Sequence, residues 1–258
     1  MKIELLFMPQ RSAKPRENGL TMVMDKGLSV REAEDLVSTS GHLIDFVKLG
    51  FGTSLFTNSL EEKINVYQRN DIKVYLGGTL FEAFVIRKQF EDYRKLISSL
   101  NINFVEVSDG SMQMDHDVKC EYIRILAKEN TVISEVGSKE AGVVISHNRW
   151  VAMMQNELQA GSIKVIAEAR ESGNVGIYDA KGNADTELVN DILANVPLDK
   201  IIWEAPLKSQ QVWFIKHFGT NVNLGNIAPG EVISLETLRM GLRGDTFHQF
   251  LPNNISNI

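Results

Sequence analysis

Short runs of β-branched and aliphatic residues recur along the 258-residue chain, and a longer segment with apolar positions at helical spacing follows each run. Short apolar runs predict buried strands, and apolar residues at every third or fourth position predict amphipathic helices. The predicted strands are Leu20–Met24, Phe46–Leu49, Ile72–Leu76, Asn103–Val107, Thr131–Val136, Lys164–Ala167, Ile201–Trp203 and Asn221–Leu224. The predicted helices are Val30–Val37, Glu61–Gln68, Phe81–Leu96, Val118–Ala127, Trp150–Leu158, Glu187–Leu193, Gln210–Ile215 and Glu231–Met240.

Several of the helix starts carry the pattern of a capping box. In this pattern a Ser or Thr oxygen and a Glu three residues later accept hydrogen bonds from free backbone amides. The predicted boxes are Ser29 with Glu32, Ser59 with Glu62, and Thr79 with Glu82.

This alternation of strands and helices predicts an α/β fold, a single (β/α)8 barrel of the TIM type. No linker rich in Pro, Gly or Ser interrupts the pattern, so we expect residues 1–258 to form one barrel domain. A doubly wound open sheet is the alternative, but no G-x-G-x-x-G motif follows the first strand.

A charged residue closes six of the predicted strands, two positions after an apolar residue on the same face. In a barrel the carboxyl ends of the strands converge on the mouth that holds the active site. Burying such charges costs several kcal/mol per ion unless a partner, metal or ligand offsets it, in order of magnitude. We therefore expect a site formed by Asp25, Lys48, Glu106, Glu135, Glu168 and Glu204.

Three of these carboxylates, Glu135, Glu168 and Glu204, come from neighbouring strands. Oxygen ligands that converge in this way suit a hard divalent cation, so the sequence predicts a Mg2+ site. Zinc is disfavoured because the five histidines show no H-x-x-x-H spacing and Cys120 is the single cysteine.

Basic residues gather opposite the carboxylates in the predicted mouth. The early strands contribute Lys26 and Lys48, together with the carboxylate of Asp25. Further basic residues are Lys139 and Arg170, just after strands five and six, and Arg16, just before strand one. A half-mouth of this kind would bind a doubly charged phosphate or carboxylate substrate.

Two glycine turns are further candidates for binding an anion. Gly77-Gly78-Thr79 opens a helix, where backbone amides and the helix N-terminus could hold the anion, although a simple tight turn explains it equally well. Asn223 and Gly225 lie near the end of strand eight, in the region where barrels commonly bind phosphate.

Other chemistries find less support in the sequence. No G-x-S-x-G motif accompanies a catalytic serine, and Arg243-Gly-Asp245 is best explained as a structural ion pair or as part of a tail that covers the mouth. The sequence leaves open whether Lys48 or Lys139 forms an imine or only contacts an anion.

Composition narrows the classes of partner. The net charge of −6 argues against nucleic acid as the main partner. There is no signal peptide pattern and no uninterrupted apolar run long enough to span a membrane, so we expect a cytoplasmic protein with a reduced cysteine. Because barrels commonly associate through their outer helices, we expect a homo-oligomer.

Nine segments in order make the chain similar to a known family, and they cover almost its whole length. They begin with Lys14-Pro-Arg-Glu-Asn-Gly-Leu-Thr-Met-Val-Met-Asp-Lys-Gly27 and end with Leu235-Glu-Thr-Leu-Arg-Met-Gly-Leu-Arg-Gly-Asp-Thr246. Between these lie 47–54, 77–82, 106–111, 134–139, 168–173, 204–215 and 221–226. On these segments the chain resembles the phosphosulfolactate synthase family, which also contains plant heat-stress-associated relatives.

The resemblance implies a (β/α)8 barrel that adds sulfite to phosphoenolpyruvate with the help of Mg2+. The product is (2R)-2-O-phospho-3-sulfolactate, on the route to sulfolactate or coenzyme M. Under this resemblance Lys139 is the general acid, with a phosphate contact as its alternative role. Lys48, Lys26 and Arg170 would hold phosphate and sulfite, and Asp25 would orient them.

Two other functions remain open from the sequence. One is a catalytically silent stress-protection or binding protein on the same barrel. The other is a different barrel lyase acting on a phosphorylated small molecule, for example an aldolase that uses Lys48.

Overall fold

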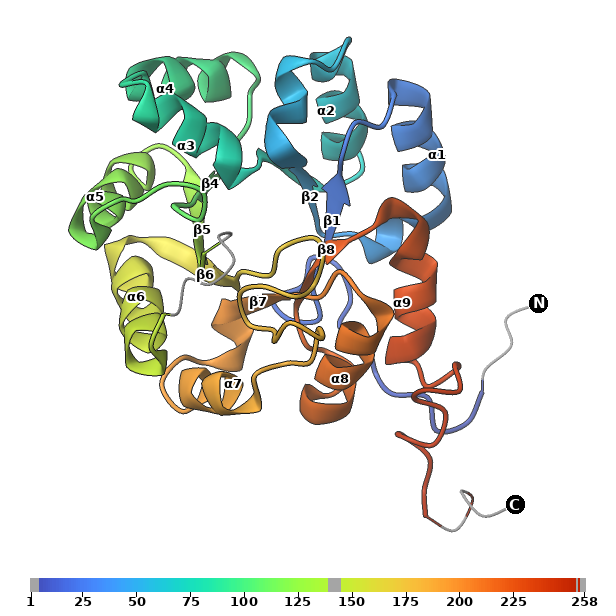
Figure 1. Ribbon diagram of the computed structural model, residues 1–258. Coiled ribbons are helices and arrows are strands. Elements are labelled where there is room, and N and C mark those ends of the chain that lie inside the picture. The colour runs from blue at the N-terminus through green and yellow to red at the C-terminus, as the bar shows by residue number, and fades with distance from the viewer. Residues whose placement is uncertain (1–4, 139–144, 254, 256–258) are drawn as a thin grey trace.

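The computed structural model describes residues 5–138, 145–253 and 255. Eight parallel strands form one sheet at the centre of the molecule (Figure 1). They are β1 (Thr21–Asp25), β2 (Phe46–Leu49), β3 (Lys73–Leu76), β4 (Phe104–Val107), β5 (Thr131–Val136), β6 (Ser162–Ala167), β7 (Ile201–Glu204) and β8 (Leu224–Ile227).

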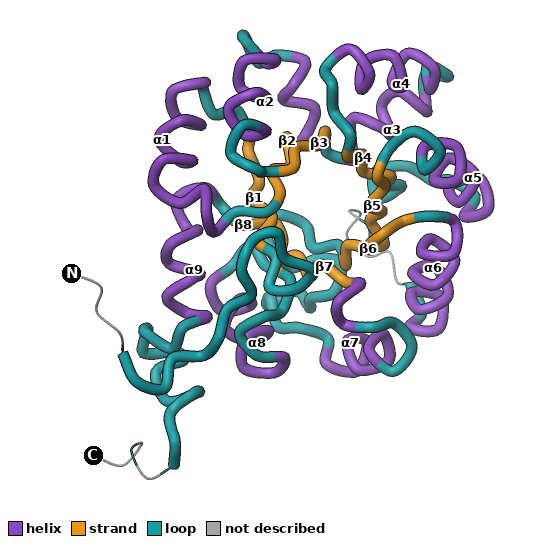
Figure 2. The backbone as a smooth tube through the Cα atoms, turned by 180° about the vertical axis from the view of Figure 1, so that it is seen from behind, coloured by secondary structure: helices purple, strands orange, loops and turns teal. Residues whose placement is uncertain are grey.

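The sheet curls into a barrel that is nearly closed. Hydrogen-bonded neighbours follow the order β3-β2-β1-β8-β7-β6-β5-β4, and every pairing is parallel. The two ends of this order, β3 and β4, lie next to each other in the ring of strands (Figure 2). The predicted (β/α)8 barrel is therefore confirmed.

Helices surround the strands as an outer ring, as Figure 2 shows from the opposite side. The α-helices are α1 (Val30–Ser40), α2 (Leu60–Gln68), α3 (Gly78–Ile86), α4 (Phe90–Ser99), α5 (His116–Leu126), α6 (His147–Ala160), α7 (Thr186–Leu193), α8 (Lys208–Phe218) and α9 (Val232–Arg239). Four short 3-10 helices are η1 (Gly41–Leu43), η2 (Gly50–Leu55), η3 (Leu198–Lys200) and η4 (Pro229–Glu231).

Two predicted elements differ from the structure. The helix predicted over 81–96 is two helices, α3 and α4, separated by Lys88 in a left-handed conformation with φ 60°. Strand β8 runs from Leu224 to Ile227 and so begins where the predicted strand ends; the Gly and Asn at positions 225 and 226 hid the strand from the apolar pattern. This shift places Asn223 just before the strand instead of near its end.

One of the three predicted capping boxes forms. Ser29 accepts a hydrogen bond from the Glu32 amide, and the Glu32 carboxylate accepts one from the Ser29 amide. Ser59 makes no such bond because its backbone is left-handed, with φ 53°. Thr79 lies inside α3, whose N-cap is Gly77, so the second and third boxes were wrong.

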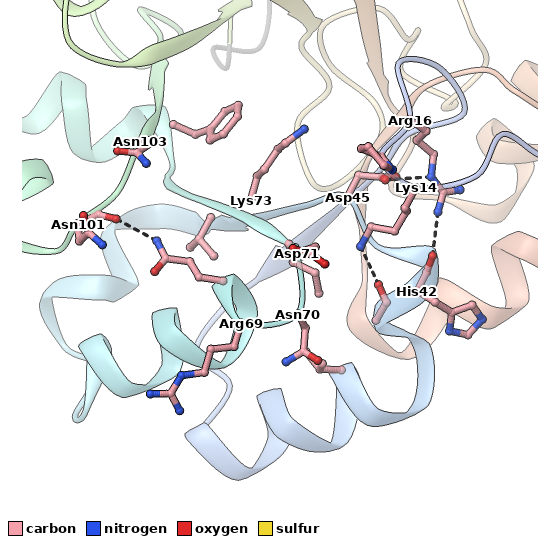
Figure 3. A pocket seen from close by; sticks show the side chains of 17 residues that line it. Lys14, Arg16, His42, Asp45, Arg69, Asn70, Asp71, Lys73, Asn101 and Asn103 are labelled. Carbon is pink, nitrogen blue, oxygen red and sulfur yellow. Dashed lines mark hydrogen bonds and ion pairs between the residues drawn. The ribbon is translucent and has the colours of Figure 1, made fainter.

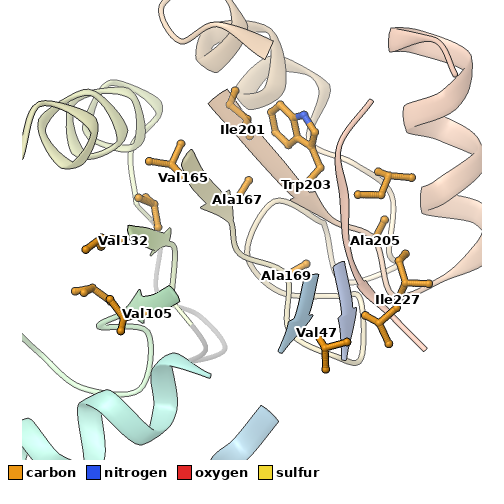
Figure 4. Close-up of a cluster of buried hydrophobic side chains, with 14 of the residues drawn as sticks. Val47, Val105, Val132, Val165, Ala167, Ala169, Ile201, Trp203, Ala205 and Ile227 are labelled. Carbon is orange, nitrogen blue, oxygen red and sulfur yellow. The ribbon is translucent and has the colours of Figure 1, made fainter. Parts of the chain in front are cut away.

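Two sets of buried apolar side chains stabilise the barrel. The larger set lies between strands and helices, and Figure 4 shows part of it, with Val47, Val105, Val165 and Trp203 from different strands. The second set comes from strand positions of the opposite parity and fills the barrel interior: Leu20, Met22, Phe46, Tyr75, Ile133, Ile166 and Ile202. Inside and outside positions thus alternate along each strand.

Among the described residues, no helix combines the length and the apolar character needed to cross a bilayer.

The interior layer should contribute much of the stability. Ile202 is completely buried inside the barrel, whereas Ile163 on β6 is 40% exposed. We expect Ile202→Ala to lower the free energy of unfolding by about 2–5 kcal/mol, because it leaves a cavity in a closed layer. The matched change Ile163→Ala should cost less than about 1 kcal/mol. Urea denaturation of both variants measures the difference, and equal losses would contradict this description of the interior.

Candidate active site

Charged side chains from separate strands meet above the apolar interior, at the carboxyl end of the barrel. The ammonium nitrogen of Lys48 on β2 lies 2.7 Å from a carboxylate oxygen of Glu135 on β5. The same nitrogen lies 3.0 Å from Glu106 on β4 and 3.4 Å from Glu204 on β7. All four side chains are almost fully buried. Lys48 therefore joins opposite sides of the barrel through one charged group.

Burial and mutual charge set the protonation of this cluster. Burial alone would lower the pKa of Lys48, but Glu106, Glu135 and Glu204 together outweigh it and hold that pKa well above its usual value. Burial raises the pKa of Glu204 to about 7, against the opposing effect of Lys48. One ammonium does not balance three carboxylates, so the site favours a further cation or a proton.

A second set of contacts extends the cluster toward α3. The Ser108 hydroxyl donates a 2.6 Å hydrogen bond to Glu82 and lies 3.1 Å from Glu135. The amide of Gly78 donates to Glu106 at 2.5 Å. A Cβ atom at Gly78 would lie 2.3 Å from the Ser108 Cβ, so only glycine permits this approach. The glycine turn therefore positions a carboxylate of the site.

Hydrogen bonds that involve the backbone hold Glu204 and Glu135 in position. Glu204 accepts a hydrogen bond from the Ala169 amide at 2.9 Å, and its carbonyl accepts one from the Tyr178 hydroxyl at 2.6 Å. The carbonyl of Glu135 accepts a 2.6 Å hydrogen bond from the ammonium of Lys119. The segment between β6 and α7, which carries Ala169 and Tyr178, lies across the end of the barrel near β7 in Figure 1.

The three carboxylates predicted as metal ligands come together. Glu135, Glu168 and Glu204 each offer an oxygen, these oxygens all lie within 4.8 Å of one another, and all three residues are buried. A set of hard oxygen donors at this spacing fits a small divalent cation such as Mg2+ after modest adjustment. The donor chemistry of the three carboxylates therefore fits a divalent metal ion.

A cavity of about 380 Å3 opens beside the carboxylates, large enough for a small substrate. Its walls include Lys48, Glu168 and Glu204 from the cluster, and Thr79 and Arg170 from the loops. Its other lining residues are Met24, Phe51, Gly77, Ser111, Ala169, Glu171 and Asn226. Because carboxylates and cations line the same cavity, an anionic substrate could bind there next to a metal.

The chain was compared with models of known protein families. The family described as ComA, (2R)-phospho-3-sulfolactate synthase, matches residues 9–245. The chain belongs to the phosphosulfolactate synthase family. The resemblance drawn from the sequence motifs is thereby confirmed, and so is the expectation of an enzyme with this activity.

Relatives agree with this membership of the phosphosulfolactate synthases. The chain is 43% identical over 244 residues to the phosphosulfolactate synthase of Methanothermobacter thermautotrophicus, covering 92% of this chain and 95% of the relative. It is 40% identical over 245 residues to that of Bacillus subtilis, covering 94% and 97%. A distant relative is the Protein HEAT-STRESS-ASSOCIATED 32 of Arabidopsis thaliana, 20% identical over 260 residues, covering 89% and 88%.

The solved structure of 3-hexulose-6-phosphate synthase from Salmonella typhimurium has a similar fold. The TM-score is 0.58 at 13% identity, with 87% of this chain and 100% of that chain covered. At this identity the likeness shows the barrel alone.

Asp25 does not face the mouth of this phosphosulfolactate synthase barrel, contrary to the sequence prediction. Its carboxylate points outward, 2.9 Å from the ammonium of Lys63 and 3.0 Å from the hydroxyl of Tyr67, both on α2. It also accepts hydrogen bonds from the amides of Gly27 and Leu28. Asp25 therefore holds the loop after β1, while Met22 and Met24 take the inward positions of that strand.

Arg16 and Asn223 lie at the opposite end of the barrel from the carboxylates. Arg16 pairs with Asp45, the residue before β2, at 2.9 Å. Asn223, the residue before β8, accepts a hydrogen bond from the Leu20 amide and donates to the carbonyl of Ile201. Both side chains therefore tie strand starts together.

The remaining predicted contacts divide between the cavity wall, the rim and the barrel interior. Gly77, Thr79 and Arg170 line the cavity, and exposed Lys26 pairs with Glu171 across its rim. The amides of Gly77 and Gly78 donate to the Leu49 carbonyl and to Glu106, so these two groups do not cradle an anion. Gly225 lies within β8, where a Cβ would be 2.6 Å from Met22. Lys139 lies outside the described residues.

Several residues of the site escaped the sequence prediction. Glu82 was assigned to a helix cap, whereas its carboxylate faces Ser108 and the Ser111 amide. Ser108 and Asn226 were not among the predicted site residues, whereas Ser108 contacts Glu135 and Asn226 lines the cavity. Glu106, by contrast, was among the charges expected at the mouth, and the structure places its carboxylate 3.0 Å from the ammonium of Lys48.

Lys119 should stabilise the strand that carries Glu135, because its ammonium donates to the Glu135 carbonyl. Its fully buried ammonium lies 2.8 Å from Glu157 and 2.7 Å from Asp109. We expect Lys119→Met to lower the free energy of unfolding by about 3–5 kcal/mol, since it leaves a buried carboxylate without its partner. The double variant Lys119→Met/Glu157→Leu should recover at least half of that loss in urea denaturation. Equal instability of the single and double variants would contradict the pairing.

Proposed function

We propose that this chain adds sulfite to phosphoenolpyruvate in a Mg2+-dependent reaction that gives (2R)-2-O-phospho-3-sulfolactate. The observation that carries the proposal is the meeting of Glu135, Glu168 and Glu204 beside a cavity lined by Lys48 and Arg170. Membership of the phosphosulfolactate synthase family supports the same reaction.

The reaction forms a carbon–sulfur bond and adds one proton. The lone pair on sulfur attacks the methylene carbon, and the electron pair of the double bond moves toward the substrate carboxylate. Mg2+ held by Glu135, Glu168 and Glu204 would stabilise the charge that develops there. A proton then goes to the carbon that bears the phosphate, so no group leaves the substrate.

The cations of the chain have separate roles in this proposal. Lys48, fixed by Glu106, Glu135 and Glu204, contacts the substrate from the floor of the cavity with its charge permanently present. Arg170 and Lys26, on the loops above, hold the phosphate and the sulfite. Asp25 acts indirectly, through the amides of the loop that carries Lys26.

The same geometry weighs against an aldolase that uses Lys48. Imine formation needs a neutral amine, whereas the surrounding carboxylates hold the pKa of Lys48 well above its usual value. A catalytically silent role also finds little support, since burying this many charged groups is costly without a ligand.

We also propose that the protein works in the cytoplasm as a homo-oligomer. The buried free thiol of Cys120 fits a reducing compartment. Three exposed apolar side chains support an association surface: Leu55 at the end of η2, Phe56 directly after it, and Ile86 at the end of α3.

Phosphorus NMR tests the reaction directly. With phosphoenolpyruvate, sulfite and Mg2+, the purified protein should produce a new phosphomonoester signal that EDTA abolishes and added Mg2+ restores.

Glu168→Gln should raise the Mg2+ concentration needed for half-maximal turnover by about tenfold or more, because it removes a charged ligand. The control Glu187→Gln, an exposed change on α7, should behave as wild type. A folded wild-type protein without any new signal would refute the proposed function.

Lys139 is the proposed general acid, a role that rests on the family resemblance. We expect Lys139→Ala to lower kcat by about 100-fold or more, in line with the usual contribution of a positioned acid. Lys128→Ala, an exposed lysine just after α5, is the matched control and should retain full activity. Wild-type turnover of Lys139→Ala would overturn the assignment. A large rise in KM with little change in kcat would instead indicate a phosphate contact.

A further inference from the structure

A second cavity, of about 900 Å3, lies at the amino-terminal end of the barrel. It lies between the segment 14–16 and the residues that precede β2, β3 and β4, including Asp45, Asp71 and Asn103. It shares no lining residue with the active-site cavity. Figure 3 shows this space, with Lys14 and Arg16 on one side and Asn101 and Asn103 on the other. The proposed synthase reaction does not use it.

Cationic side chains at this cavity are fixed in place by the chain itself. The ammonium of Lys14 donates to the carbonyls of Ile44 and Gly41, at 2.5 and 3.1 Å. Arg16, only 8% exposed, pairs with Asp45 and donates to the His42 carbonyl at 2.8 Å. Because backbone carbonyls hold these cationic groups, Lys14 and Arg16 keep their positions when no ligand is bound. This wall of the cavity is therefore preorganised for binding.

Lys73, the first residue of β3, extends into the cavity itself. Its ammonium lies 5.2 Å from the ring centre of Phe46 and 5.4 Å from that of Phe104, which orients the side chain over an aromatic floor. Among the residues that the structure describes, no carboxylate lies within ion-pair distance of this ammonium. Figure 3 shows Lys73 reaching into the space between Asn103 and Arg16.

The charges around the cavity reinforce one another. Burial lowers the pKa of Lys14; the positive charges of Arg16 and Lys73 add to this lowering, and the carboxylates of Asp45 and Asp71 oppose it. Arg16 and Asp45 neutralise each other, which leaves Lys14, Lys73 and Arg69 against Asp71. The excess of positive charge would be balanced by a ligand carrying two negative charges. Asn70, Asn101 and Asn103 supply amide groups around the same space.

We propose that this amino-terminal cavity binds a small dianion, a phosphate or a phosphate monoester, with Lys73 as its principal contact. The aromatic floor and the volume leave room for the carbon skeleton of a small phosphorylated metabolite. The site is separate from the catalytic mouth and needs no metal.

Hydrogen exchange of the full-length protein tests this site with inorganic phosphate as the probe. Phosphate, compared with sodium chloride at equal ionic strength, should slow exchange in the backbone segments 68–76 and 101–106. The response of segments 168–173 and 204–211 at the mouth is recorded separately, so binding there does not obscure the result. Repeating the titration with glycerol phosphate and with succinate distinguishes phosphate chemistry from dicarboxylate chemistry.

Two variants of Lys73 make the test specific. Lys73→Gln should weaken the phosphate-dependent protection of 68–76 and 101–106 by about tenfold or more in apparent Kd, since it removes a charged contact. Lys73→Arg should retain most of it, and Lys95→Gln, an exposed change on α4, should leave it unchanged. Melting curves establish that each variant is folded. Sulfite-dependent turnover of Lys73→Gln without added phosphate should match wild type, so that this site and the synthase reaction are judged independently.

Four results would overturn the proposal. The first is no phosphate-dependent protection of these segments in the wild type, and the second is the same protection from chloride, which would indicate general screening. The third is undiminished protection in Lys73→Gln. Stronger protection by succinate than by glycerol phosphate would refute the phosphate assignment.

Discussion

The ion cluster around Lys48 is the interaction on which the active site depends. A single ammonium from β2 contacts carboxylates from β4, β5 and β7, so strands far apart in the sequence are held at fixed spacing by charge. In other proteins, replacing a buried ion cluster with well-packed apolar residues has often left the stability unchanged or raised it. Its presence therefore reflects chemistry more than stability, and the phosphosulfolactate synthase family to which the chain belongs supplies that chemistry.

The sequence predicted the barrel and most of the inward-facing charges because parallel strands keep a strict two-residue period. Where a strand mixes apolar and charged residues, as in Phe46 to Lys48 or Ile202 to Glu204, the charge identifies the inner face. The first strand fails this test because Leu20–Met24 is apolar on both faces, as buried parallel strands often are. Its phase could not be determined, and a shift of one residue turned Asp25 from the predicted mouth to the α2 helix.

Contacts across long sequence distances explain the other differences. Glu82 and Ser108 meet through the packing of α3 on β4, which no local pattern encodes, whereas the capping-box pattern at Thr79 was local and misleading. Arg16 and Asn223 were assigned to the mouth from their nearness to strands one and eight. Both residues precede a strand, so they lie at the amino-terminal end of the barrel, opposite the mouth. There the side chain of Arg16 pairs with Asp45, and that of Asn223 donates a hydrogen bond to the Ile201 carbonyl.

The two ends of the barrel thus differ in the charge of the side chains that gather there. At the mouth, carboxylates surround one lysine, and at the base, cations are held by carbonyls around an aromatic floor. The most direct test of the central claim is a double-mutant cycle on Lys48 and Glu135. The free energy of unfolding is measured in EDTA for wild type, Lys48→Met, Glu135→Gln and the double variant. We expect a coupling energy of at least about 1.5 kcal/mol between the two changes, and additivity within about 0.5 kcal/mol would contradict the role of this ion cluster.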